Sequence, residues 1–453
     1  MRPGTAGAHR TARARHRPTR VPLAGLLVGC CLAMVACGAV PTAAPPGPDP
    51  ATPSGRASVV PISPSPVSTP GPAAPAPPPA ATPLPASPPP SSTGAPSATP
   101  TAPATPGAVR CAGLADSLGL RDRVGQLMMV AVSSDGVGSA AASAIDDSRA
   151  GSVILLGNTT AGSTRVAAVV ERARDAARTP RGIATMVAAD QEGGQVQRLR
   201  GKGFDRIPSA QRQAQASAAE LKSDAARWGR QLRRVGIDAN LAPVADVVPK
   251  DRESVNQPIG VLRRGYGSDP AAVARHVTAF AEGMDAAGIA TAVKHFPGLG
   301  RVRGNTDVTA EVVDDTTRRR DPDLKPFAAG VRAGTDMVMM SSAYYSEIDA
   351  ARRAAFSPTV IKGMVRDDLG FTGVVISDDL AAAAMRDLSP GERMLRFLRA
   401  GGDLAIVGDA GLAARMADAV VDEARDDPKL AAAVEASTVR VLQLKDRRGL
   451  ASC

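Results

Sequence analysis

Short apolar runs recur along the second part of the chain, and most of them are separated by stretches with helical spacing. The eight runs lie at residues 127–132, 153–156, 184–189, 239–244, 290–293, 337–340, 374–376 and 404–407. Buried strands that alternate with helices are typical of a parallel sheet. Eight such units are the number in a (β/α)8 barrel, so we predict one α/β domain, a TIM barrel, over residues 111–453.

One predicted helix has clear start and stop signals. Asp269 offers a capping oxygen, Pro270 suits the first turn, and Gly288 follows the last turn. Four apolar residues between these signals share one face, which we expect to be buried: Val273, Val277, Phe280 and Met284. We interpret His276 on this helix as a packed or surface histidine. The Ala-rich, amphipathic segment 410–444 predicts closing helices around the last strand.

Composition separates the first 110 residues from the rest of the chain. They contain eight Arg and one Asp, so they account for most of the net charge of +10 and leave about +3 for residues 111–453. Aromatic residues make up only 2% of the chain, and no basic patch has aromatics interleaved with it. We therefore expect no nucleic-acid partner.

The N-terminal segment has the features of a secretory signal. Six Arg lie within the first 20 residues, and the apolar stretch at 21–35 is short for a membrane span. The tetrapeptide MVAC, which ends at Cys37, resembles a bacterial lipobox. We therefore predict a lipoprotein signal peptide over residues 1–37, lipidation of Cys37, and an extracytoplasmic protein anchored to the cell membrane. The tetrapeptide LVGC, which ends at Cys30, is the alternative site.

Residues 38–110 are predicted to form a disordered linker, because residues 41–110 hold 24 of the 39 prolines and few apolar side chains. After this segment the only cysteines are Cys111 and Cys453, at the two ends of the predicted domain. In an oxidising compartment one disulfide between them would tie these ends together. Two unpaired cysteines are the alternative.

Polar residues close three of the eight apolar runs. Asp190 follows the third run, Lys294 and His295 end the fifth, and Asp378 follows the seventh. Barrel enzymes carry their sites at the carboxyl ends of the strands. Since the third, fifth and seventh strands alternate around the ring, we expect these side chains to converge on one pocket.

Three motifs at these strand ends resemble the barrel of glycoside hydrolase family 3: DQEGGQVQRL at 190–199, KHFPGLG at 294–300 and SDDL at 377–380. The resemblance spans about residues 115–445 and is strongest to single-domain β-N-acetylhexosaminidases, which remove N-acetylglucosamine from cell-wall fragments. A membrane-tethered form is similar to the lipoprotein branch of high-GC Gram-positive bacteria. The resemblance implies a retaining glycosidase with a carbohydrate substrate and no cofactor, and we expect a monomer.

The family pattern also implies roles for single residues. Asp378, the first aspartate of SDD, takes the position of the nucleophile, and we expect Asp379 to cap a following Ala-rich helix. Because the loop before GYGSDP is two residues longer than the pattern, Arg263 is a possible substitute for the family arginine. The sugar-binding positions correspond to Asp190, Arg198, Arg264, Lys294 and His295.

The acid/base position departs from the family pattern. Residues 305–307 read Asn-Thr-Asp where the subgroup has Asp-Ser-His, so Asp307 takes the place of the histidine and Asn305 that of the aspartate that orients it. A carboxyl group can protonate a glycosidic oxygen if burial or a nearby Asp378 raises its pKa. We predict Asp307 as the acid/base, on a loop whose composition is typical of a mobile flap: Gly298, Gly300 and Gly304.

A second departure is Ala343, where family members often have a histidine. Tyr344 or Tyr345 would line the rim there or pack beneath it. Three other functions stay open: a sugar-binding lipoprotein that has lost catalysis, a β-glucosidase-type hydrolase of the same family, and a lyase with Lys294 as Schiff base. The predicted domain has two histidines and no cysteine cluster with zinc spacing, so we predict no metal site.

Overall fold

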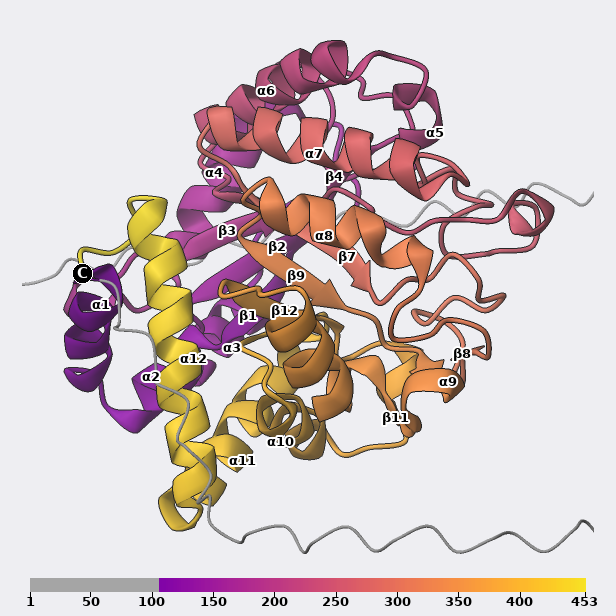
Figure 1. Ribbon diagram of the computed structural model, residues 1–453. Helices are drawn as coiled ribbons and strands as arrows, with labels where there is room; N and C mark the ends of the chain where they lie inside the picture. Colours follow the sequence, from indigo (N-terminus) through magenta and orange to yellow (C-terminus); the bar gives the residue numbers. More distant parts are fainter. Residues whose placement is uncertain (1–105) are drawn as a thin grey trace, which may run out of the picture. The chain divides into compact units, whose positions relative to one another are not determined.

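The computed structural model describes residues 106–453. The predicted signal peptide, its candidate lipidation site Cys37 and linker residues 38–105 lie outside the described residues. Eight parallel strands close into a barrel in the order β1-β13-β12-β9-β7-β6-β3-β2 (Figure 1). Around the ring this is the order of the chain, with helices between the strands. The prediction of a (β/α)8 barrel is therefore confirmed.

All eight apolar runs fall on barrel strands. The strands of the barrel are β1 Met128–Ser133, β2 Ser152–Leu156, β3 Met186–Ala189, β6 Ala239–Asn240, β7 Ala290–Phe296, β9 Met337–Met340, β12 Val374–Asp379 and β13 Leu404–Val407. Short strands outside the barrel are β4 Gln191–Gly193, β5 Val196–Gln197, β8 Val313–Asp314, β10 Tyr344–Tyr345 and β11 Ala350–Arg353. The apolar side chains of the barrel strands are almost completely buried.

Five barrel strands, β2, β3, β6, β7 and β12, differ in length from the predicted runs. β6 ends early because Pro243 has no N–H for the ladder, and pairing with β7 resumes only as a single bridge between Val244 and Lys294. β7 and β12 extend beyond their apolar runs to Phe296 and Asp379. The polar residues that close these two runs are thus held by the strands themselves.

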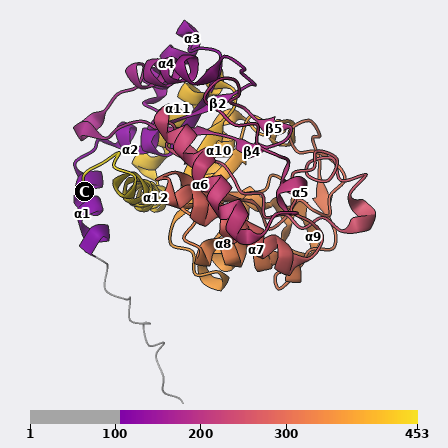
Figure 2. The same cartoon turned by 90° about the horizontal axis from the view of Figure 1, so that it is seen from above.

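Helices cover the outside of the barrel, and α6, α7 and α8 lie side by side on one flank (Figures 1 and 2). The helices are α1 Pro106–Asp116, α2 Leu120–Gln126, α3 Ser139–Ser148, α4 Gly162–Asp175, α5 Ala210–Gln213, α6 Ala218–Arg234, α7 Pro270–Ala286, α8 Lys325–Arg332, α9 Ser346–Asp349, α10 Pro390–Ala400, α11 Ala413–Asp426 and α12 Pro428–Arg447. A π-helical segment, Thr359–Asp368, follows β11. No helix among residues 106–453 has the length and apolar character that a membrane crossing requires.

The helix predicted after GYGSDP is α7, and its signals act as expected. The carboxylate of Asp269 accepts hydrogen bonds from the N–H groups of Ala271 (3.2 Å) and Ala272 (3.1 Å). The four apolar residues of the predicted face are all buried. His276 is also buried and stacks on Tyr266 at 5.6 Å, so it packs as predicted.

A disulfide joins Cys111 of α1 to Cys453 at the C-terminus. Around it α1 packs against α12 (Figure 1). Ile183 and Leu442 complete a small apolar cluster with Cys111. The structure thus has the bridge and not two free thiols. It also moves one predicted boundary, because α1 begins at Pro106, so residues 106–110 are helical. Pro106 suits the first turn, and the bridge at residue 111 fastens this helix.

Replacing Cys453 with serine is expected to lower the free energy of unfolding by about 2–5 kcal/mol. The physical reason is that the bridge joins residues 342 positions apart and so restrains the unfolded chain. Thermal unfolding without reductant measures the loss, and wild-type protein with reductant should match the variant. Identical unfolding midpoints for the oxidised wild type and the variant would contradict this expectation.

Candidate active site

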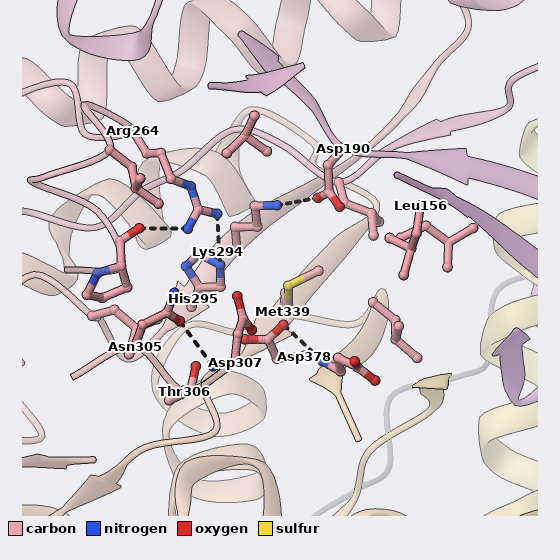
Figure 3. A pocket seen from close by; sticks show the side chains of 18 of the residues that line it. Leu156, Asp190, Arg264, Lys294, His295, Asn305, Thr306, Asp307, Met339 and Asp378 are labelled. Atoms are coloured by element: carbon pink, nitrogen blue, oxygen red, sulfur yellow. Dashed lines mark hydrogen bonds and ion pairs between the residues drawn. The ribbon is translucent and has the colours of Figure 1, made fainter. Parts of the chain in front are cut away.

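A pocket of about 400 Å³ opens at the carboxyl ends of the barrel strands (Figure 3). It is lined by every catalytic or sugar-binding residue that the sequence predicts: Asp190, Arg198, Arg264, Lys294, His295, Asp307 and Asp378. Asp190 follows β3, and the residues of the fifth and seventh runs lie in β7 and β12. These three strands alternate around the ring, so the expected convergence on one pocket is observed.

Two cations and two carboxylates form a buried cluster on one side of the pocket. Lys294 Nζ lies 2.7 Å from Asp190 Oδ1 and 2.7 Å from Glu192 Oε1. Arg264 binds Glu192 through two hydrogen bonds of 2.8 Å, from Nε and Nη2. Burial alone would raise the pKa of Glu192, but the charges of Arg264 and Lys294 hold that pKa well below its usual range. Glu192 is therefore ionised and fixes both cations.

The sequence motifs did not identify Glu192 as a site residue. One signal was available, because Glu192 stands two positions after Asp190, and alternate residues of an extended segment share a face. Both carboxylates affect the pKa of Lys294. Burial by itself would lower the pKa of Lys294, whereas Asp190 and Glu192 together raise it above its ordinary value. Lys294 is thus a stable cation.

A second carboxylate that the motifs did not identify, Asp246, holds His295. Asp246 Oδ2 lies 2.8 Å from His295 Nδ1, and Oδ1 accepts the backbone N–H groups of His295 (3.2 Å) and Leu299 (2.7 Å). Asp246 is completely buried. Because a carboxylate accepts there, Nδ1 carries a proton. Nε2 lies 3.4 Å from Arg264 Nη2. The available signal was the position of Asp246 just after the fourth apolar run.

The choice between the two neighbouring arginines is settled by the backbone. Arg264 lines the pocket, and its Nη1 donates to the carbonyl of Pro258 at 2.8 Å. Arg263 is exposed and has a φ of 55°, which turns the chain there. Arg264 therefore reaches the site and Arg263 does not. Arg198 also lines the pocket, and among residues 106–453 its buried Nε has no hydrogen-bond partner.

Asp378 and Asp307 face the same part of the pocket (Figure 3). Burial raises the pKa of Asp378 to about 6; the charge of Asp307 acts in the same direction, while His295 and Lys294 oppose it. Asp378 Oδ1 also accepts the N–H of Asp379 at 2.9 Å. Burial and the charge of Asp307 therefore both favour the protonated form of Asp378.

Asp379 does not cap an Ala-rich helix, so that prediction is wrong. Its Oδ1 accepts the N–H groups of Ala381 (2.8 Å) and Gly408 (2.7 Å), which ties the end of β12 to the end of β13. The alanines form only one short 3-10 turn, and α10 begins at Pro390. Tertiary contacts outweigh helix propensity here, because backbone N–H groups of this turn bond to the loop that carries Asp307.

That loop, residues 297–312, already lies over the pocket. The N–H of Ala384 donates to the carbonyl of Thr306 (3.1 Å), and the N–H of Ala383 donates to that of Asp307 (3.2 Å). Asp307 N–H bonds to Asn305 Oδ1 at 3.0 Å. Gly300 is required by close packing, since a Cβ there would lie 1.7 Å from the carbonyl of Val247. These bonds place Asp307 at the edge of the pocket, which it lines.

The two tyrosines after β9 pack and do not line the pocket. The hydroxyl of Tyr345 is buried and donates to the carbonyl of Gly298 at 2.7 Å, which supports the base of the loop. The guanidinium of Arg353 lies over the ring of Tyr344, with its central carbon 4.8 Å from the ring centre. Ala343 is completely buried. This segment therefore packs against the start of the loop that carries Asp307.

Comparison with known proteins identifies the family. The family model for the glycosyl hydrolase family 3 N-terminal domain matches residues 119–444. The chain belongs to glycoside hydrolase family 3. A crystal structure of the β-N-acetylhexosaminidase from Beutenbergia cavernae DSM 12333 is 45% identical, with a TM-score of 0.71, over 72% of this chain and 98% of that chain. This family 3 protein is a glycosidase.

Two further relatives fit the same family. The β-hexosaminidase of Stenotrophomonas maltophilia (strain R551-3) is 36% identical over 231 residues, which cover 49% of this chain and 66% of that protein, just under two thirds. The structure of a family 3 β-N-acetylglucosaminidase from Paenibacillus sp. str. FPU-7 is 28% identical, with a TM-score of 0.67, over 74% of this chain and 64% of that chain. Both cysteines of the disulfide lie outside residues 119–444.

Changing Glu192 to glutamine is expected to lower kcat/KM for a chromogenic β-glycoside by at least about tenfold, because Lys294 and Arg264 would lose the charge that holds them in the pocket. Steady-state kinetics measure the effect. The matched control is Glu282→Gln, which removes an exposed pair with Lys222 of 2.7 Å and should change little. Equal kinetics for the two variants would refute the role of Glu192.

Proposed function

We propose that this family 3 glycosidase is a retaining β-N-acetylhexosaminidase that removes terminal, non-reducing β-linked N-acetylglucosamine from peptidoglycan-derived saccharides. The observation that carries the proposal is the pair of carboxyl groups, Asp378 and Asp307, that face one part of the pocket. Retaining glycosidases place such a pair about 5–5.5 Å apart. The names of the relatives from Beutenbergia, Stenotrophomonas and Paenibacillus support the choice of sugar.

In the first step the carboxylate of Asp378 attacks the anomeric carbon and the glycosidic C–O bond breaks. This step requires the form of the enzyme in which Asp378 is ionised and Asp307 is protonated. The carboxylic acid of Asp307 then gives its proton to the departing oxygen, so the aglycone leaves as a neutral alcohol. In the second step Asp307, now a carboxylate, takes a proton from water, and the hydroxyl oxygen attacks the glycosyl ester. Asp378 is released, and the sugar keeps its β configuration.

The remaining pocket residues hold the sugar that is cleaved. Asp190, a carboxylate, accepts hydrogen bonds from hydroxyl groups, and Lys294 and Arg264 donate to them from fixed positions. His295 and Arg198 line the same pocket. A volume of about 400 Å³ suits one sugar ring with the start of its aglycone, which fits release of a terminal residue.

The lyase alternative is not supported by the state of the lysine. A Schiff base requires a neutral amine, whereas Asp190 and Glu192 both contact Lys294 at 2.7 Å and raise its pKa. A catalytically impaired sugar-binding protein is the alternative that the acid/base substitution favours. It predicts ligand binding without turnover, which the first experiment below distinguishes.

We further propose that the enzyme is extracytoplasmic and anchored to the cell membrane by a lipid on Cys37, and that it acts as a monomer. The disulfide between Cys111 and Cys453 supports this location, because such bridges persist in oxidising compartments. The linker would let the barrel reach wall fragments while the lipid stays in the membrane.

Incubation with an activated 2-deoxy-2-fluoro-β-glucoside, followed by peptide mass mapping, is expected to show a covalent sugar on the peptide that contains Asp378. Parallel assays with a chromogenic N-acetyl-β-glucosaminide should show turnover in the wild type and a loss of at least about a thousandfold in Asp378→Asn, since the nucleophile is removed. Undiminished turnover in Asp378→Asn, or sugar binding without any turnover in the wild type, would overturn the proposal.

The rate of this covalent labelling is expected to fall as the pH drops below about 6, because Asp378 must be ionised to attack and its pKa lies at about 6. In Asp307→Asn the negative neighbour is gone, so the pKa of Asp378 should fall and the acidic limb should move to lower pH. Labelling rates of the wild type and Asp307→Asn, measured from roughly pH 4 to pH 8, test this shift, because that range includes the pKa of Asp378 expected in both proteins. An unmoved limb would show that Asp307 does not act on Asp378.

A further inference from the structure

Asn256 joins the two loops that carry Arg264 and Asp307. It lies in the loop between β6 and α7 and is completely buried. Its Nδ2 donates to the carbonyls of Leu299 and Val302, both at 2.7 Å. Its Oδ1 accepts backbone N–H groups of the turn at residues 259–260, at 3.2 and 2.8 Å. The hydrogen-bonding capacity of this amide is therefore fully used between two loops.

The oxygen of Asn256 holds the turn at residues 258–260, which binds Arg264. The turn that it holds presents two carbonyls to that arginine: Pro258 O accepts from Arg264 Nη1 at 2.8 Å, and Ile259 O accepts from Arg264 N at 3.0 Å. Arg264 then reaches Glu192 and the pocket. A change in this turn would therefore move the guanidinium.

The nitrogen of Asn256 secures the base of the other loop. Leu299 and Val302 are buried, and Asp307 lies five residues after Val302 in the same loop. Leu299 is also held through its N–H by Asp246, the residue that orients His295. The start of this loop is thus held by Asp246, which also holds the proposed sugar-binding residue His295.

We infer that Asn256 is a positioning residue that fixes the position of Asp307 relative to that of Arg264, although Asn256 does not line the pocket. The inference rests on the proposed role of Asp307 as acid/base. Only an amide supplies two donors at one end and an acceptor at the other in this geometry. Because the donors and the acceptor serve different loops, the two effects can be separated by substitution.

Asn256→Asp is the variant that separates them. Aspartate has the same shape and keeps an oxygen for the turn at 259–260, but it places a second oxygen against the carbonyls of Leu299 and Val302. The loop that carries Asp307 should therefore shift while Arg264 keeps its seat. Leaving-group dependence then reports on the acid, since a dinitrophenyl aglycone departs without protonation and a sugar aglycone does not.

We expect Asn256→Asp to lower kcat/KM at least about a hundredfold for an N-acetylglucosamine disaccharide and less than about threefold for the dinitrophenyl N-acetyl-β-glucosaminide, because general acid catalysis contributes about 10²–10⁴-fold. The matched control is Asn240→Asp, an equally buried asparagine that bonds to the backbone of Gln191 and not to the loop. It should affect both substrates by the same factor. A merely structural role for Asn256 would give that same equal loss and would refute the inference.

Asp307→Ala separates this inference from the proposed function. If Asp307→Ala shows no leaving-group dependence, Asp307 is not the acid and both proposals fail. If Asp307→Ala shows it and Asn256→Asp does not, only the role of Asn256 fails. Should Asn256→Asp not fold, Asn256→Ala takes its place, with the disaccharide again losing at least about tenfold more than the dinitrophenyl substrate. Equal losses in that variant would also refute the inference.

Discussion

The pocket depends on charges that are removed from water and paired with one another at the mouth of the barrel. Glu192 between Lys294 and Arg264 is the centre of this arrangement, because a buried ion is tolerated only when its partners have good geometry. The cations that it holds line the pocket, and Lys294 also opposes the rise in the pKa of Asp378 that burial causes. That pairing fixes the two cations in the pocket, and the charge of Lys294 favours the ionised form of Asp378.

The loops at this end of the barrel are held by buried polar side chains and not by apolar packing alone. Asp246 fixes the ring of His295 and the start of the loop over the pocket, and Asn256 connects that loop to the seat of Arg264. Apart from the bond to the His295 ring, these bonds end on backbone N–H and C=O groups, which need partners when they are buried. The loop therefore lies over the site in a defined position, although three glycines suggest mobility.

Much of the fold and of the pocket could be predicted from the sequence, because both follow from local patterns. The apolar runs marked all eight strands, and Asp190, Lys294 and Asp378 closed strands that alternate around the ring. Glu192 and Asp246 escaped prediction because their importance lies in partners distant along the chain. The alanines after Asp379 were misread as a helix because their N–H groups bond to a distant loop, which propensity does not register.

The central claim is that Asp378 and Asp307 act on one anomeric carbon in two successive displacements. Proton NMR of the sugar released from an N-acetyl-β-glucosaminide, recorded before mutarotation, tests it most directly. We expect the β anomer to appear first, since two inversions restore the configuration. First appearance of the α anomer would mean that water attacks directly and that no glycosyl-enzyme intermediate forms on Asp378.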